Sequence, residues 1–116
     1  MKYAFTIYTD ESQRDSATPE QMQQVSEAYG ALTQEMTEKG ILVAGDGLYP
    51  TSTATTVRVR DNERDVTDGP FAETKEQLGG FYVVDCKDLD EALEWASRIP
   101  TAKSGCVEVR PVIQYD

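Results

Sequence analysis

The sequence predicts an α+β fold in one domain over residues 1–116, with a βαββαβ order of elements and an inserted hairpin. Residues 18–40 and 88–99 each combine helix start and end signals with apolar residues at helical spacing. Segments of alternating side chains lie before, between and after these helices, as in β-strands. A chain of 116 residues rarely holds two independent cores, so the helices should cover one face of a single sheet.

A polar stretch separates the first strand from the first helix. The strand is expected over residues 3–8, where the side chains alternate, and residues 9–17 are expected to form a loop. Thr18 should cap the helix, with Pro19 at its first position and Gln21 completing a capping box. The helix should end at Lys39-Gly40. Its predicted buried face consists of Met22, Val25, Tyr29, Leu32 and Met36.

The middle of the chain is read as a strand followed by a hairpin. Residues 41–48 form the strand, and residues 55–60 and 64–67 form the hairpin around Asp61-Asn62-Glu63. A further strand is expected over residues 79–86. Asp88 should cap the second helix, whose predicted buried face is Leu89, Ala92, Leu93, Ala96 and Ile99, before Pro100 ends it. With a last strand over residues 106–113, this order predicts a ferredoxin-like arrangement.

The sheet face that the helices leave open has a mixed character. Six residues are expected to share it: Thr6, Tyr8, Arg58, Arg60, Glu108 and Arg110. Such a face is too apolar to be fully solvated and too polar for a closed core. We therefore expect a homodimer whose facing sheets enclose a partly polar cavity.

Composition excludes several classes of partner. The 21 acidic and 11 basic side chains give a net charge of −10, which disfavours nucleic acid because phosphate binding needs a basic surface. No window approaches the roughly 18 apolar residues of a membrane span. The N-terminal residues lack a signal-peptide pattern, so we expect a cytoplasmic protein without membrane contact.

The types of residue present limit the chemistry. The chain has no histidine, the commonest general base and metal ligand. Cys86 and Cys106 form no metal or redox motif, and a ferredoxin-like strand order would place them about 9.6 Å apart, too far for a disulfide. We expect two reduced thiols, no metal and no cofactor.

Residues 68–81, which read DGPFAETKEQLGGF, resemble the signature of DGPF-domain proteins, a branch of the YCII-related family. The similarity extends from the first strand to the segment Val107-Glu108-Val109-Arg110-Pro111. It implies a dimeric α+β barrel built from ferredoxin-like halves, and for many DGPF-type proteins a gene neighbour encoding an extracytoplasmic-function sigma factor. Other YCII-related proteins carry a histidine–aspartate pair, and a chain without histidine cannot use that mechanism.

Three acidic residues are candidates for the site. Asp68, followed by glycine and proline, is typical of a turn, although the turn can also aim its carboxylate into the dimer cavity as a general base. Glu73 is either a solvated loop residue or part of a pocket mouth. Asp46 lies between two glycines and is either a turn residue or a pocket carboxylate.

Arginine and tyrosine complete the candidate site. Arg58 and Arg110 alternate with valines and are either interface residues or an anion clamp for a small carboxylate. Tyr8 either packs in the sheet or donates a hydrogen bond to a substrate oxygen. Two functions remain: a homodimer that binds a small molecule or a regulatory protein, and a cofactor-free isomerase or lyase acting on a small carboxylate or lactone. In the second, Asp68 is the base and Tyr8 or Arg58 stabilises an enolate-like oxygen.

Overall fold

The computed structural model describes residues 1–115 and contains six strands and three α-helices. The strands are β1 (Lys2–Thr9), β2 (Leu42–Gly47), β3 (Thr55–Arg60), β4 (Glu63–Asp68), β5 (Gln77–Asp85) and β6 (Cys106–Pro111). The helices are α1 (Glu11–Asp15), α2 (Pro19–Glu38) and α3 (Leu89–Ser97), and two short 3₁₀ turns are η1 (Thr51–Thr53) and η2 (Pro100–Lys103).

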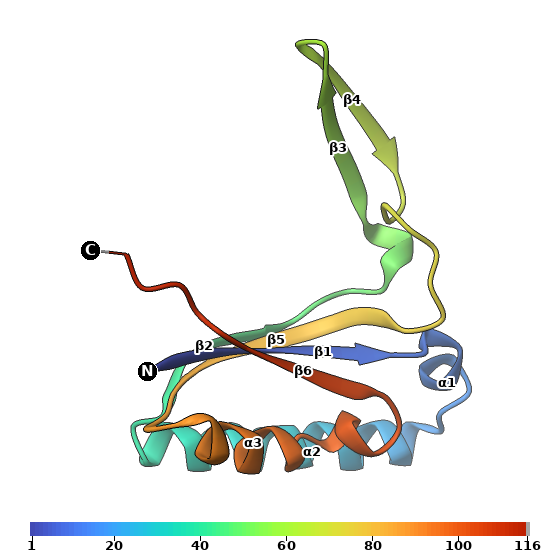
Figure 1. The fold of residues 1–116 in the computed structure, drawn as a ribbon. Helices are drawn as coiled ribbons and strands as arrows, with labels where there is room; N and C mark the ends of the chain where they lie inside the picture. The colour runs from blue at the N-terminus through green and yellow to red at the C-terminus, as the bar shows by residue number, and fades with distance from the viewer. Residues whose placement is uncertain (116) are drawn as a thin grey trace.

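Four strands form the main sheet in the order β2-β5-β1-β6, and every neighbouring pair is antiparallel. Helices α2 and α3 lie side by side against one face of this sheet, and the other face carries no helix (Figure 1). The predicted α+β class is confirmed, with the helices on a single side of an antiparallel sheet.

The core lies between the sheet and the two long helices. Its largest fully buried side chains are Phe5 from β1, Val84 from β5, Met36 from α2 and Ile99 after α3. Helix α3 differs from its predicted face, because Leu89 and Leu93 are exposed while Trp95 is buried with Ala92 and Ala96. The helix is rotated so that its largest aromatic side chain, which offers the most apolar area, faces the core.

Local hydrogen bonds explain where the N-terminal helices begin. The capping box of α2 is present: the Gln21 amide donates to the Thr18 hydroxyl at 3.1 Å, and the Thr18 amide donates to the Gln21 side chain at 2.9 Å. The predicted loop over residues 9–17 is wrong, since it contains α1. Asp10 caps α1 by accepting from the Ser12 amide at 3.0 Å, and no residue of α1 is buried. A short helix without an apolar face gives no periodic signal.

Strands β3 and β4 form a separate two-stranded sheet rather than part of the main one. Asp61 and Asn62 connect them with φ of 51° and 65°, the conformation that tight hairpin turns require. The hairpin projects from the side of the main sheet that faces away from the helices (Figure 1). The expectation that Arg58 and Arg60 share the open sheet face with Tyr8 is therefore wrong within one chain.

Two further observations concern the molecule as a whole. None of the helices in residues 1–115 is both long enough and apolar enough to cross a membrane. The radius of gyration is 16.1 Å, which exceeds the roughly 13.4 Å typical of a compact domain of this length, because the hairpin extends away from the core.

Candidate functional site

The Asp68-Gly69-Pro70-Phe71 segment forms the base of the hairpin. Gly69 has a φ of 100°, which favours glycine, and its amide donates to the Ala54 carbonyl at 2.7 Å. The Thr56 hydroxyl donates to the Gly69 carbonyl at 2.8 Å. The predicted turn is therefore present and is fixed to the start of β3. The Asp68 side chain itself is exposed in the single chain.

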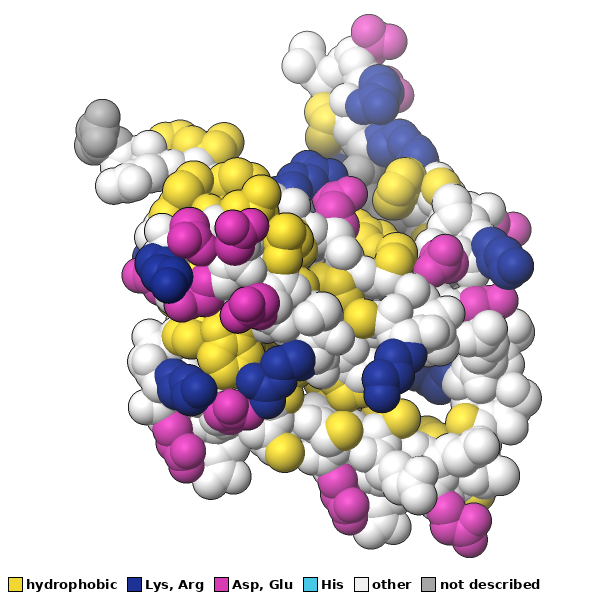
Figure 2. Space-filling model, turned by 60° about the horizontal axis from the view of Figure 1, so that its bottom comes forward, with side chains coloured by type: hydrophobic (Ala, Val, Ile, Leu, Met, Phe, Trp, Pro, Cys, Tyr) yellow, Lys and Arg dark blue, Asp and Glu magenta, His cyan; other side chains and the backbone are white. Residues whose placement is uncertain are grey.

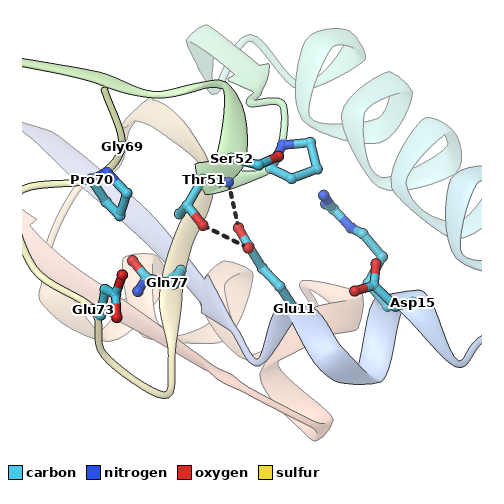
Figure 3. Close-up of a pocket in the computed structure, with 10 residues that line it drawn as sticks. Glu11, Asp15, Thr51, Ser52, Gly69, Pro70, Glu73 and Gln77 are labelled. Atoms are coloured by element: carbon cyan, nitrogen blue, oxygen red, sulfur yellow. Dashed lines mark hydrogen bonds between the residues drawn. The ribbon is translucent and has the colours of Figure 1, made fainter. Parts of the chain in front are cut away.

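A pocket of about 530 Å³ opens beside this turn. It lies where α1, the η1 turn and the segment after β4 meet (Figure 3). The residues that line it are Glu11, Arg14, Asp15, Pro50, Thr51, Ser52, Gly69, Pro70, Glu73 and Gln77. Of the predicted site residues, Glu73 lines this pocket and Asp68 adjoins it in sequence, whereas Tyr8, Asp46, Arg58 and Arg110 do not line it.

Glu11 fastens two walls of the pocket together. Its carboxylate accepts hydrogen bonds from the Thr51 amide at 2.9 Å and from the Thr51 hydroxyl at 2.8 Å (Figure 3). Asp10, which caps α1 immediately before Glu11, accepts hydrogen bonds from the Ser12 hydroxyl and amide. These hydrogen bonds hold the pKa of Asp10 below its usual value. The pocket is thus shaped by short, local hydrogen bonds around α1.

The charges that line the pocket are three carboxylates and one guanidinium, Arg14. No pattern in the sequence indicates Thr51, and the expectation of a loop over residues 9–17 leaves out Glu11 and Arg14. The signal that identifies them is Asp10 as a helix cap, a residue type that is strongly preferred there. Arg14 forms no ion pair among residues 1–115, so its charge is available to a ligand.

The open face of the main sheet holds the other predicted residues. The strand register places Asp46, Phe81, Thr6 and Glu108 in one row across the four strands. Tyr8 lies two residues further along β1, opposite Cys106. The Thr6 hydroxyl is buried without a hydrogen-bond partner, which is costly unless another group satisfies it. The open face therefore carries Tyr8 on β1, Asp46 on β2 and Arg110 on β6.

Arg110 is already engaged on this face. Its Nε donates to Glu108 Oε1 at 2.5 Å, and this hydrogen bond raises the pKa of the Arg110 guanidinium. Arg58 lies on the hairpin instead, directly opposite Asp65, and forms no ion pair within 4.0 Å among residues 1–115. The two arginines do not form one clamp in a single chain.

The cysteines and acidic side chains give no sign of a metal centre in the part of the chain that the structure describes. Both cysteines are free, as predicted; Cys86 is buried and Cys106 is exposed. Burial raises the pKa of the Cys86 thiol to about 11, while slight desolvation and the nearby Glu76 raise the pKa of the exposed Cys106 thiol. No group of three cysteine, aspartate or glutamate side chains in residues 1–115 is arranged to hold a metal ion.

Comparison with known proteins agrees with the sequence motif. The sequence model of the YCII-related domain matches residues 1–116. The chain is also 43% identical over 117 residues to the uncharacterised protein R00369 of Rhizobium meliloti, an alignment that covers 99% of this chain and 94% of that protein. The length of both matches shows that this chain belongs to the YCII-related family.

Proposed function

We propose that this chain is a non-catalytic binding protein that acts as a homodimer of two ferredoxin-like halves, a dimeric α+β barrel. The observation that carries the proposal is its surface area. The single chain exposes 8415 Å², whereas a compact monomer of this mass exposes about 6,300 Å². The excess of about 2,100 Å² falls in the range that one subunit buries in an obligate homodimer, about 1,000–2,500 Å².

Apolar side chains on the hairpin support a second copy as the occupant. Val57, Val59 and Val66 are all exposed, and the register places Val57 opposite Val66 on one face of the hairpin. A two-stranded hairpin is marginally stable alone, so this arm needs a surface to pack on. We propose that the arm packs its valine face on the partner's open sheet face, and that Arg58, which alternation places on the other face of the arm, points toward the cavity between the two sheets.

The ligand of the dimer cavity is proposed to be a small carboxylate. Arg58 is the main anion contact, because its guanidinium has no competing ion pair, whereas a ligand at Arg110 has to displace Glu108. Tyr8 is proposed to donate a hydrogen bond to the ligand, while Asp46 and Glu73 border the cavity. A small local cluster of cations is required here because the chain as a whole is strongly acidic.

The enzymatic alternative uses Asp68 as a general base for isomerase or lyase chemistry. Asp68 and Tyr8 lie on different sheets, and no hydrogen bond among the described residues joins them. We favour binding because the chain has no histidine, the commonest general base, and this reaction would have to rely on Asp68 alone. A regulatory protein, such as the sigma-factor system that the DGPF resemblance implies, is the second class of partner in this proposal. Two free thiols support a cytoplasmic location.

A thermal-shift screen tests the proposal. Small carboxylates, lactones and aromatic acids are titrated against the wild type, Arg58→Ala and the control Lys87→Ala, which removes an exposed cation outside the hairpin. At a hundred times its Kd, a ligand should stabilise the fold by about 2.7 kcal/mol, a shift of several degrees. Arg58→Ala should lose this shift and Lys87→Ala should keep it.

Three results would overturn parts of the proposal. Absence of any shift would exclude small carboxylates as the ligand class and leave the protein partner, which a pull-down with the wild type would identify. A shift that survives in Arg58→Ala would place the ligand elsewhere. Turnover of a bound acid that Asp68→Asn abolishes would replace the binding function by the enzymatic one.

A further inference from the structure

The N-terminal half of α2 does not pack on the sheet. Met22, Val25, Leu32 and Met36 lie on one stripe of the helix, yet only Leu32 and Met36 are buried, while Met22 is 52% and Val25 47% exposed. Between this half of the helix and the sheet lies a cleft of about 1,100 Å³. Figure 2, which looks onto the helix side, shows a hollow there with hydrophobic side chains along it and basic side chains beside it.

Glycines form the floor of this cleft. Gly45 and Gly47 in β2 and Gly80 in β5 are paired with Tyr82, Gly80 and Ile7, which places them on the helix-facing side of the sheet. Gly45 must lack a side chain, since a Cβ there would lie 2.5 Å from the Tyr82 ring. Gly47 is different: its φ is not positive, and a Cβ would meet nothing within 4 Å. A larger side chain at Gly47 would therefore fit into the cleft and fill part of it.

Two pairs of hydroxyl groups that line the cleft are already hydrogen-bonded to each other. The Tyr29 and Thr101 hydroxyls are 2.6 Å apart, and the Thr33 and Tyr82 hydroxyls are 2.9 Å apart. Burial raises the pKa of Tyr29, which keeps its hydroxyl neutral. These hydroxyls have partners within the protein and do not require a polar ligand.

The charge of the cleft comes from one side chain. Arg14 and Asp46 are the charged residues that line it. Strand alternation directs the Asp46 side chain to the opposite face from Gly45 and Gly47. Arg14 approaches the floor, since its Nη2 lies 4.0 Å from the position a Cβ on Gly79 would take, and it forms no ion pair among residues 1–115.

We propose that this cleft binds a linear carboxylate with an apolar tail, a medium-chain fatty acid or its close analogue. The tail lies between Met22, Val25 and the glycine floor, and the carboxylate pairs with Arg14 at the mouth. The volume is comparable to ordinary small-molecule sites, of about 300–1,000 Å³. This site lies on the helix side of the sheet and is distinct from the proposed dimer cavity on the other side.

Calorimetric titration of the full chain with octanoate, decanoate and octanol tests the site. Wild-type protein should bind octanoate, and each methylene added toward decanoate should raise the affinity about fourfold if it is buried. Gly47→Leu should weaken binding more than tenfold by filling the cleft. Gly30→Leu, the same change on the exposed side of α2 where a Cβ also meets nothing, should leave it within twofold. Circular dichroism and thermal melts confirm that each variant is folded, and Gly47→Val replaces Gly47→Leu if the larger side chain prevents folding.

Arg14→Gln separates the charge from the apolar surface. It should weaken octanoate binding about tenfold and leave octanol binding unchanged, because octanol lacks the carboxylate. The proposal is overturned by no binding to the wild type, or by Gly47 variants that bind as the wild type does. Equal losses of octanoate and octanol in Arg14→Gln would overturn the assignment of the carboxylate to Arg14.

Discussion

The two hydrogen bonds between Glu11 and Thr51 hold together the pocket beside the Asp68-Gly69-Pro70-Phe71 turn, and their removal tests the structure of this pocket. Glu11→Ala removes the acceptor of both bonds, whereas Thr51→Val removes only the hydroxyl donor and keeps the amide. If the bonds form in solution, the two substitutions are coupled and their effects on the free energy of unfolding do not add.

The expected size follows from the geometry. Hydrogen bonds to a charged group contribute about 1.5–3 kcal/mol when buried, and both residues are only partly buried, so about 1 kcal/mol for each bond is appropriate. Glu11→Ala should therefore cost about 2 kcal/mol and Thr51→Val about 1 kcal/mol. The double variant should cost about 2 kcal/mol, which leaves an interaction energy of about 1 kcal/mol.

Urea denaturation of the four proteins at one fixed protein concentration measures these energies, since the stability of a dimer depends on concentration. Thr55→Val, an exposed threonine at the start of β3, serves as the matched control with Glu11→Ala. Its effect should add to that of Glu11→Ala within about 0.5 kcal/mol. If the effect of Thr51→Val on the free energy of unfolding also adds to that of Glu11→Ala within about 0.5 kcal/mol, the two residues do not interact in solution and the proposed structure of the pocket is refuted.

Three other predictions follow from single residues. Gly45→Ala should destabilise the fold by about 1–3 kcal/mol, because its Cβ would lie 2.5 Å from the Tyr82 ring; a thermal melt equal to the wild type would contradict this close approach. The lowered pKa of Asp10 means that its stabilisation is present above its ordinary pKa near 3.8 and is lost as pH falls through the folded-state value. Asp10→Asn should therefore lose less stability than the wild type between pH 5 and pH 2, and parallel acid-denaturation curves would argue against the cap. Iodoacetamide at pH 8 should label Cys106, which faces the cavity of the proposed dimer, before Cys86, whose thiol is buried in the core with a pKa of about 11. Mass spectrometry that finds Cys86 labelled first in the folded protein would contradict its placement.

Local sequence signals predict the elements whose causes are local. The capping box at Thr18, the tight turn at Asp61-Asn62 and the alternation of Tyr3, Phe5 and Ile7 each appear in the structure where the sequence indicates them. In each case the residues that make the structure are within a few positions of one another, so one segment contains the whole signal.

The differences arise where distant segments decide the outcome. The apolar stripe of α2 predicts burial of Met22 and Val25, but glycines on β2 and β5 leave that half of the helix without a surface to pack on. Trp95 rather than Leu93 enters the core, since the facing side chains set the rotation of α3. The two strands of the hairpin that carries Arg58 pair only with each other. Alternation of side chains predicts a strand but does not show which sheet the strand joins.

The proposed function depends on the pairing of two open sheet faces, which the molar mass in solution reveals. Size-exclusion chromatography with light scattering should give about 25.8 kDa, twice the 12.9 kDa of one chain, across a wide range of protein concentration. A constant mass of 12.9 kDa would contradict the account, because the excess surface, the hairpin arm and the cavity would then have no second copy to complete them.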